Sequence, residues 1–156
     1  MEGATGYKVY RGSKLLKTIT NGSTVSFTDT TAKNGKKYTY KVVAYAGSTD
    51  TNKSTSAKVT IYRLAGVSIK SAKNTASKKI TVTYGKNSKA SGYQIKYVTG
   101  SNAKTVSVTK AAAVKKVLSN LKKGKTYRIY VRAYKKVSGT KYYSAWSAAK
   151  SVKVKK

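Results

Sequence analysis

The residues best suited to bind a ligand lie near the C-terminal end of the chain, where aromatic and cationic side chains occur close together. Aromatic rings can stack on a sugar or a nucleic-acid base, while lysine and arginine can pair with anionic groups of the same ligand. Such a surface would bind without any chemical step. The candidate ligand face consists of six residues: Arg128, Tyr130, Arg132, Tyr134, Lys141 and Trp146.

Catalytic chemistry is difficult to build from the other side chains. The chain has no histidine and no cysteine, and its three acidic residues are the scattered Glu2, Asp29 and Asp50. Glycoside hydrolysis needs two carboxylates within roughly 5 to 10 Å of each other. A serine or lysine nucleophile would lack a base and a group to orient it. We therefore expect no enzyme activity, and we expect Asp29 to cap the backbone of its own turn.

Metal and cofactor sites are also not expected. Zinc and copper prefer imidazole and thiolate ligands, which this sequence lacks, and calcium requires a cluster of carboxylates. No glycine-rich phosphate loop stands between a strand and a helix. The sequence therefore predicts no metal and no cofactor.

The charge of the chain is strongly positive, because 34 lysines and arginines face three acidic residues, for a net charge of +31. A charge of this size attracts polyanions such as nucleic acids, anionic glycans and cell-wall polymers. The cations are spread along the whole chain and alternate with apolar residues, as on the solvent faces of strands. No nucleic-acid-binding motif is present, so nucleic acid should bind only nonspecifically. No apolar run approaches about 18 residues, so no membrane span is predicted.

The elements that must position the ligand face are strands. Residues 127–134 alternate between apolar and polar positions with a period of two, which is typical of a strand with distinct faces. Leu121, Gly124 and Tyr127 stand three residues apart just before it. This spacing predicts a turn between two sheets, with the Tyr127 ring filling the corner and its hydroxyl bonded to upstream backbone. With 14 tyrosines and few helix formers, the chain is predicted to be all-β.

The sequence contains one unit twice. Residues 6–10 recur as 92–97, and residues 35–45 recur as 124–134. The seam between the two copies falls near residues 63–66, which predicts one domain over 1–63 and another over 64–156. Self-similarity of this kind indicates tandem modules.

The second copy is predicted to be complete. Turn signals at regular intervals separate seven short segments, which favours a two-sheet sandwich. Ile80, Val82 and Tyr84 should face its core. The segment 111–118 could begin a helix, but eight residues without a cap favour a strand. The predicted strands cover 66–71, 79–84, 93–98, 104–109, 111–118, the stretch ending at 134, and 142–154.

The first copy is predicted to lack its first two strands. Its predicted strands are 7–11, 15–20, 25–27, 37–46 and 55–64. Without the missing strands, Tyr7, Val9, Tyr40 and Val42 would lack core partners. Two explanations compete: the chain is a C-terminal fragment of a longer repeat protein, which we favour, or another protein donates strands by edge addition.

Several motifs resemble fibronectin type III domains of bacterial surface proteins. They are Leu121-x-x-Gly124-x-x-Tyr127, Tyr93-x-Ile95-x-Tyr97 and the run from Tyr143 to Ser147. In the first copy, Phe27-x-Asp29 and Gly35-x-x-Tyr38 carry the likeness. The resemblance covers 64–156 as a complete module and 3–63 as a partial one. The lysine- and tyrosine-rich style is similar to tandem modules of Gram-positive gut anaerobes.

The resemblance has two departures and one consequence for the ligand face. Tyr84 stands where the family usually has a core tryptophan, and its hydroxyl needs a partner. Ala32 or a neighbouring threonine replaces the corner leucine of the first copy, which should weaken that corner. In related sandwiches, a Ser-x-Trp-Ser stretch stacks its indole between arginines of the neighbouring strand. The resemblance therefore favours a structural ladder of Trp146 with Arg128 and Arg132 over an open ligand platform.

The function implied by the resemblance is a non-catalytic spacer and adhesion region of a larger bacterial secreted or cell-surface protein. Its lysine faces would associate electrostatically with anionic wall polymers or glycans. The alternative is a specific carbohydrate- or protein-binding module that uses the Tyr, Trp and Arg face of the second copy. Because this fold hosts many unrelated roles, the motifs themselves do not choose between the two.

Overall fold

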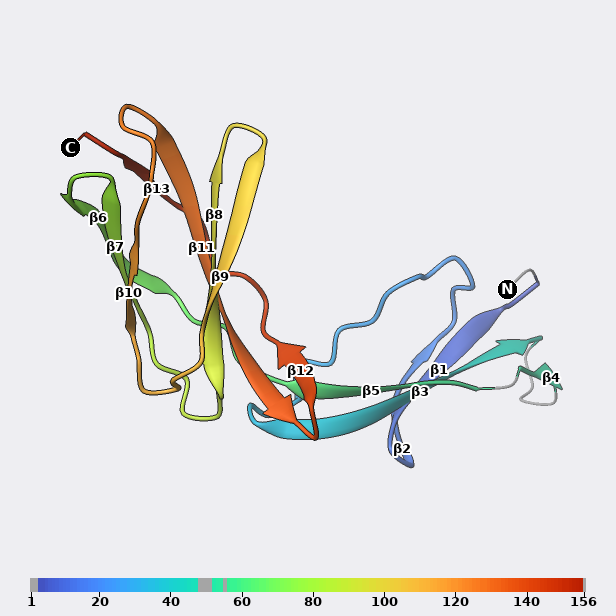
Figure 1. The fold of residues 1–156 in the computed structure, drawn as a ribbon. Coiled ribbons are helices and arrows are strands. Elements are labelled where there is room, and N and C mark those ends of the chain that lie inside the picture. The colour runs from blue at the N-terminus through green and yellow to red at the C-terminus, as the bar shows by residue number, and fades with distance from the viewer. Residues whose placement is uncertain (1–2, 48–51, 55, 156) are drawn as a thin grey trace. The chain divides into compact units, whose positions relative to one another are not determined.

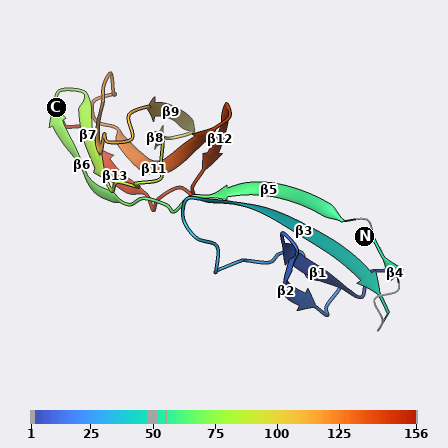
Figure 2. The same ribbon diagram turned by 90° about the horizontal axis from the view of Figure 1, so that it is seen from below.

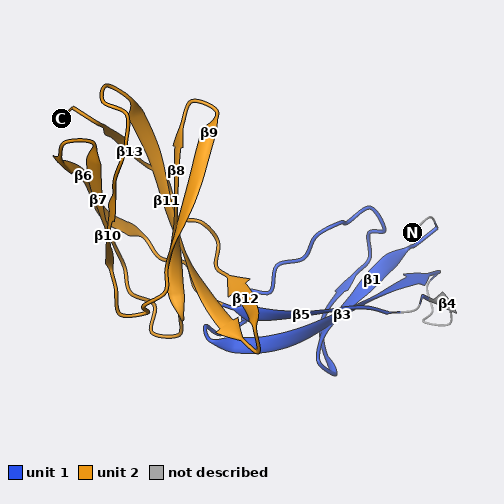
Figure 3. Ribbon diagram, in the orientation of Figure 1, with its two compact units in different colours: residues 1–63 blue, residues 64–156 orange. Residues whose placement is uncertain are grey.

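The computed structural model describes residues 3–47, 52–54 and 56–155, and every regular element within these ranges is a β-strand. The chain divides into two compact units, residues 1–63 (unit 1) and 64–156 (unit 2), which are shown in different colours in Figure 3. The all-β prediction is therefore confirmed. No helix able to cross a membrane occurs in the described ranges.

Unit 2 is a sandwich of two antiparallel sheets (Figure 1). One sheet has the strand order β10-β7-β6, and the other has the order β12-β11-β8-β9, with β13 also paired to β11. The strands are β6 Ile69–Ala76, β7 Lys79–Tyr84, β8 Gly92–Thr99, β9 Asn102–Val108, β10 Lys115–Leu118, β11 Thr126–Val137, β12 Thr140–Tyr143 and β13 Lys150–Lys153.

The core of unit 2 lies between these sheets and follows the predicted alternation. Ile80, Val82 and Tyr84 on β7 are fully buried, as the sequence predicts. From the opposite sheet, Ile129 and Val131 on β11 are fully buried as well. Each such aliphatic side chain stabilises the fold by about 1.5–3 kcal/mol relative to an exposed one.

The tyrosine corner forms as predicted. Leu121 and Tyr127 are buried, and the backbone N–H of Lys122 donates to the Tyr127 hydroxyl over 2.9 Å. Gly124 turns the chain with a φ of 78°, a conformation that a residue with a Cβ rarely adopts. The upstream backbone group is thus satisfied while the ring stays in the core.

The corner of unit 1 has the same geometry in spite of its substituted leucine. The N–H of Lys33 donates to the Tyr38 hydroxyl over 3.0 Å, and Gly35 also has a φ of 78°. Ala32 therefore does not prevent the corner from forming. The tyrosine and the glycine are sufficient to set the turn.

The single last strand predicted over 142–154 is wrong. The chain forms β12 and β13 with residues 144–149 between them, because six residues here face only four residues of β11, 130–133. Ser144 and Ser147 accept hydrogen bonds through Oγ from the N–H groups of Ala133 and Val131, each over 3.0 Å. Side-chain hydroxyls therefore replace part of the backbone ladder across this bulge.

Two further boundaries differ from the prediction. The first strand of unit 2 is β6, which starts and ends later than the predicted 66–71, because residues 72–76 pair with β7 in a hairpin. The turn of this hairpin contains Lys78 with a φ of 53°. Within 111–118, only β10 is a strand, and Ala113 N–H closes a turn on the Lys110 carbonyl.

Unit 1 contains one sheet in its described residues (Figure 2). Its strand order is β2-β1-β3-β4, and β5 pairs with β3. The strands are β1 Gly6–Arg11, β2 Lys14–Ile19, β3 Lys36–Ala46, β4 Asn52–Lys53 and β5 Ala57–Arg63. The predicted strand over 55–64 begins at Thr55, which lies outside the described residues, and the rest of it corresponds to β5.

The strand predicted over 25–27 is wrong, and Val25 is 98% exposed. The corresponding segment of unit 2 is β10, whose ladder partner is β7. The described part of unit 1 contains no counterpart of β7. Residues 25–27 therefore lack the neighbour that would make them a strand, although their sequence favours one.

Candidate functional site

The tryptophan of the predicted ligand face lies against the guanidinium of Arg132. The Arg132 carbon Cζ lies 4.3 Å from the Trp146 ring centre and 3.8 Å from that of Tyr143. Its Nε and one terminal nitrogen donate to Gln94 Oε1 over 3.0 and 2.7 Å. Because Gln94 opposes Arg132 in the β8–β11 ladder, this fork fixes the plane of the guanidinium between the rings.

A lysine continues this arrangement. Lys96 Nζ lies 4.8 Å from the Trp146 ring centre and 4.6 Å from that of Tyr130, its partner across the ladder. Lys141 Nζ lies 5.1 Å from the Tyr134 ring centre. Each contact of a cation with an aromatic face stabilises by about 0.5–2 kcal/mol, depending on solvent exposure. We call Lys96, Tyr130, Arg132, Tyr143 and Trp146 the ladder.

The structure brings five of the six predicted residues into cation–ring contacts. Arg128 is the exception: it is exposed on the same strand, and among the described residues no ring lies over it. The ladder therefore uses Arg132 and Lys96 where two arginines were predicted. Lys96 and Gln94 were missed, although their alternation with Tyr93 and Ile95 places them on the outer face of β8.

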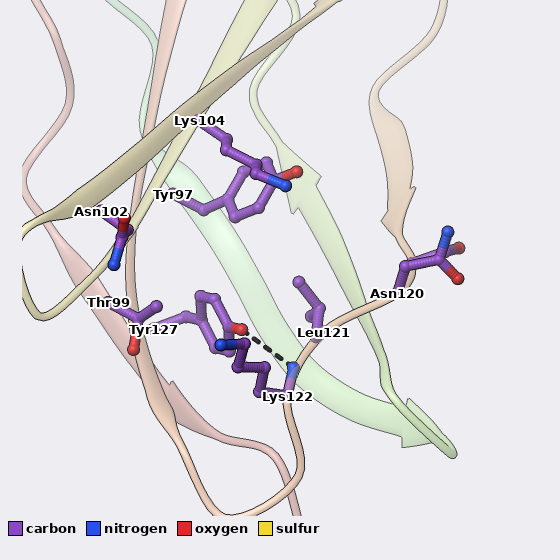
Figure 4. Close-up of a pocket in the computed structure, with 9 residues that line it drawn as sticks. Tyr97, Thr99, Asn102, Lys104, Asn120, Leu121, Lys122 and Tyr127 are labelled. Carbon is purple, nitrogen blue, oxygen red and sulfur yellow. Dashed lines mark hydrogen bonds between the residues drawn. The ribbon is translucent and has the colours of Figure 1, made fainter.

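A cleft on unit 2 lies apart from the ladder (Figure 4). Its volume is about 390 Å³, within the range of small-molecule sites. Tyr97 of β8 and Tyr127 of β11 form its aromatic part, with ring centres 6.2 Å apart and planes inclined by 52°. The turn segment 119–122 and the β8–β9 hairpin form its walls.

The polar groups of this cleft are amides and ammonium groups. Asn102 and Lys104 come from β9, and Asn120 and Lys122 come from the turn segment. No carboxylate lines the cleft, so its charge is positive. Amides suit the hydroxyls of a sugar, and ammonium groups suit an anionic substituent. None of these residues belonged to the predicted ligand face, because β9 and the turn segment meet only in the folded unit.

Asp29 does more than cap its turn. Its Oδ1 accepts from the N–H and hydroxyl of Thr31, as expected, but its Oδ2 accepts from the Tyr40 hydroxyl over 2.6 Å. Arg11 also donates to Oδ2 over 2.9 Å. The bond from Tyr40, followed by those from Thr31, lowers the pKa of Asp29 from 3.8 to about 2. Asp29 is thus a carboxylate held in its charged form, an arrangement that stabilises structure.

The described residues contain no group of three or more His, Cys, Asp or Glu side chains that could hold a metal ion. The Tyr84 hydroxyl is buried and has no hydrogen-bond partner among the described groups. Burial raises the pKa of Tyr84 to about 12. The partner that this hydroxyl was expected to need is therefore not provided by the surrounding core.

The comparisons with known proteins address the fold. No protein-family model and no curated protein matches the chain. Among solved structures, the FN1-FN3 domains of chicken CNTN1 are 25% identical over 99% of this chain, with a TM-score of 0.50. The fold is fibronectin type III-like. The chain covers 55% of the length of that CNTN1 structure.

A second solved structure, described as a myokine, is 14% identical, with a TM-score of 0.49. That match covers 59% of this chain and 97% of the myokine chain. A fibronectin type III-like fold indicates a non-catalytic β-sandwich module. Its role has to be argued from its surfaces, because the same sandwich serves many functions.

Proposed function

We propose that the chain is a non-catalytic spacer and adhesion region of a larger bacterial secreted or cell-surface protein. It would consist of two tandem fibronectin type III-like modules, the first without its two N-terminal strands. Its positively charged faces would associate electrostatically with anionic wall polymers or glycans. The fold supports the module, and the charge supports the association.

The observation that carries this proposal is a positive charge that almost nothing neutralises. Where the structure describes the side chain of a lysine or arginine, that residue is exposed or half-buried and never buried. The one carboxylate side chain within the described ranges, Asp29, is paired with Arg11. A surface with exposed cations on many strand faces concentrates polyanions by long-range attraction, without selecting a particular chemical unit.

The test is the salt dependence of binding to polymers that differ in charge. We expect the chain to bind immobilised polyphosphate and hyaluronate at low salt and to ignore neutral dextran. Affinity for both anionic polymers should fall together as NaCl rises, because the ions of the salt screen exposed charges. Binding to dextran, or affinity for hyaluronate that persists at high salt, would contradict the proposal.

A matched pair of variants separates charge from shape. Five exposed lysines of unit 2 are replaced by glutamine in one variant and by arginine in the other. The glutamine variant lowers the net charge from +31 to +26 and should bind less tightly, with a shallower salt dependence. The arginine variant keeps the charge and should bind like the parent chain. The five positions are Lys73, Lys79, Lys110, Lys123 and Lys153.

A second candidate function is specific binding of a carbohydrate, and the cleft around Tyr97 favours it. The ladder rings are poor platforms for a sugar because Arg132 and Lys96 already lie over them. The cleft instead offers the half-exposed ring of Tyr97, backed by the buried ring of Tyr127, with amide and ammonium groups. These groups match a sugar that carries a carboxylate, phosphate or sulfate.

A glycan array at high salt separates the two candidates. Sugar-selective binding that the double variant Asn102→Ala, Lys104→Ala abolishes would support the cleft. The matched control is Lys110→Ala, which removes an exposed lysine of unit 2 that does not line the cleft. A signal that fades uniformly with ionic strength, with no difference between these variants, would support nonspecific association.

A further inference from the structure

The apolar face of the unit 1 sheet is more exposed to solvent than the equivalent face in unit 2. Both sheets use the same register: Val9 lies opposite Val42 in unit 1, and Ile95 lies opposite Val131 in unit 2. Ile95 and Val131 are fully buried, whereas Val42 is 39% exposed. In unit 2 the sheet β10-β7-β6 provides the cover. The described residues of unit 1 form no second sheet.

An apolar hollow marks the uncovered face. Its volume is about 340 Å³, with Tyr7, Val9 and Val42 on its sheet side and the segment 24–27 on the other. Val9 is buried within it, while Phe27 at its rim is 40% exposed. An apolar hollow bounded by exposed apolar residues is typical of a binding surface.

The segment beside this hollow is placed to pair with a strand. Residues 26–29 and β10 both begin nine residues before the glycine of their corner, Gly35 or Gly124. In unit 2, β10 pairs with β7 in register, with Lys116 opposite Val82. In unit 1, residues 26–29 occupy the same place in the sequence but form no strand.

We propose that the open face of unit 1 binds a two-stranded β-hairpin, which covers it as β6 and β7 cover the sheet of β8 and β11. One strand of this hairpin pairs with the backbone of residues 26–29. Its alternate apolar side chains enter the hollow above Val9 and Val42. Backbone pairing gives the affinity, and the apolar alternation gives the register.

The ring arrangement of unit 2 shows how the hairpin fits. The Tyr93 hydroxyl donates to the Ala111 carbonyl over 3.2 Å, and its ring lies 4.9 Å from that of Tyr84 on β7. In unit 1, the Tyr7 hydroxyl donates to the Gly22 carbonyl over 3.0 Å. Tyr7 is therefore already held where Tyr93 receives the β7 side chain. A large apolar or aromatic residue in the hairpin would contact it.

This proposal is independent of polyanion binding, because it rests on an apolar face and not on charge. If the hairpin binds, unit 1 becomes a closed sandwich like unit 2. Failure of the salt-dependence experiment would leave this proposal in place. Failure of the experiment below would leave the polyanion proposal in place.

The test supplies unit 1 with the strands of unit 2. Residues 64–91, which contain β6 and β7, replace residues 1–5 ahead of Gly6, and the rest of the chain is kept. A soluble paramagnetic probe then reports the exposure of valine methyl groups by NMR. We expect the relaxation of the Val42 methyls to fall several-fold in the fusion, to the level of Val131. The methyls of Val131 report whether unit 2 has kept its fold.

The matched control carries threonine in place of Ile80, Val82 and Tyr84 in the donated copy alone. In this control, the Val42 methyls should remain as exposed as in the parent chain. A free peptide of residues 67–85 added to the parent chain should protect the same methyls more weakly. Val42 exposure that neither the fusion nor the peptide changes would overturn the proposal. So would a parent chain that sediments as a dimer with Val42 already protected, because a second copy would then be the occupant.

Discussion

Units 1 and 2 pair their central strands in the same register but bury very different amounts of the face that this register creates. Val131 of unit 2 is fully buried, while its counterpart Val42 is 39% exposed. The two residues hold equivalent positions in the strand pairing: Val131 lies opposite Ile95, and Val42 lies opposite Val9. The strand pattern therefore specifies a sheet and its faces, whereas burial depends on a second sheet.

The two units also differ at the corner end of the sheet. Leu118 is buried in unit 2, while Asp29, which is likewise six residues ahead of the corner glycine, forms a polar cluster in unit 1. Arg11 of this cluster corresponds to Tyr97, because each lies five residues after the glycine that begins its strand, Gly6 or Gly92. Where unit 2 uses apolar packing, unit 1 uses an ion pair and hydrogen bonds. A polar cluster tolerates solvent at an open sheet better than an aliphatic side chain does.

The largest expected effect comes from truncating the two matched valines. Val131→Ala should destabilise unit 2 by about 1.5–3 kcal/mol, because it removes fully buried methyl groups and leaves a cavity. Val42→Ala should cost unit 1 less than about 1 kcal/mol, because its side chain is partly in solvent. Denaturant unfolding, followed by NMR signals of each unit, measures both. Equal losses of stability in the two variants would contradict the difference in burial between Val42 and Val131.

The ladder provides the next effect. Trp146→Ala should lower the stability of unit 2 by about 1–2 kcal/mol through lost contacts with Arg132 and Lys96. Unit 1 should not change, and binding to polyphosphate should not change either. The control Arg128→Ala removes a cation outside the ladder and should leave stability within about 0.5 kcal/mol of the parent. Lost binding with unchanged melting of unit 2 would instead make Trp146 a ligand platform.

The next largest expected change is a gain in the stability of unit 2. Tyr84→Phe removes a buried hydroxyl that has no partner among the described groups, and should stabilise unit 2 by about 1 kcal/mol. The control is Tyr93→Phe, which should destabilise, because the Tyr93 hydroxyl accepts from Asn87 N–H and donates to the Ala111 carbonyl. Thermal unfolding measures both. A Tyr84→Phe chain that melts lower than the parent would show that this hydroxyl has a partner.

The same hydroxyl should make the stability of unit 2 depend on pH in the alkaline range. The pKa of Tyr84 is raised to about 12, so the unfolded chain loses this proton at a lower pH than the folded one. The stability of unit 2 should therefore fall as pH rises from about 10 to about 12. In Tyr84→Phe this decline should be shallower. An unchanged pH profile would contradict the assignment.

Acid should affect unit 1 by the smallest amount. The folded pKa of Asp29 is about 2, below its ordinary 3.8, so its contribution is present above pH 4 and lost as pH falls toward 2. In Asp29→Asn, unit 1 should be less stable at neutral pH and less sensitive to acid. Unit 2 has no carboxylate side chain, and its stability should not follow this titration. Parallel acid profiles of the two units would contradict the role given to Asp29.

Most of the unit 2 fold could be predicted from the sequence, since its strands alternate regularly and its corner motif is local. Ile80, Val82 and Tyr84 face the core as their spacing indicates. The bulge at Ser144 and Ser147 could not be predicted in this way, because it depends on hydroxyls bonding to the backbone of β11. The alternation of residues on a strand carries no information about such bonds.

The segment 25–27 shows a different limit. Val25 and Phe27 favour a strand by residue type, but a strand exists only with a partner. The ladder was predicted in part, since Trp146 and Arg132 meet as expected. Lys96 joins them through the β8–β11 register, which the sequence alone does not specify. The cleft at Tyr97 was missed for the same reason, because its walls are distant in sequence.

The most direct test of the difference between the two units is native-state hydrogen exchange of the full chain, resolved by residue. We predict that amides of β8 and β11 exchange only through global unfolding of unit 2. The matching amides of β1 and β3 should exchange much faster, through opening of a sheet with one uncovered face. Equal protection of Val42 and Val131 amides would contradict it, because the two faces would then be equally closed.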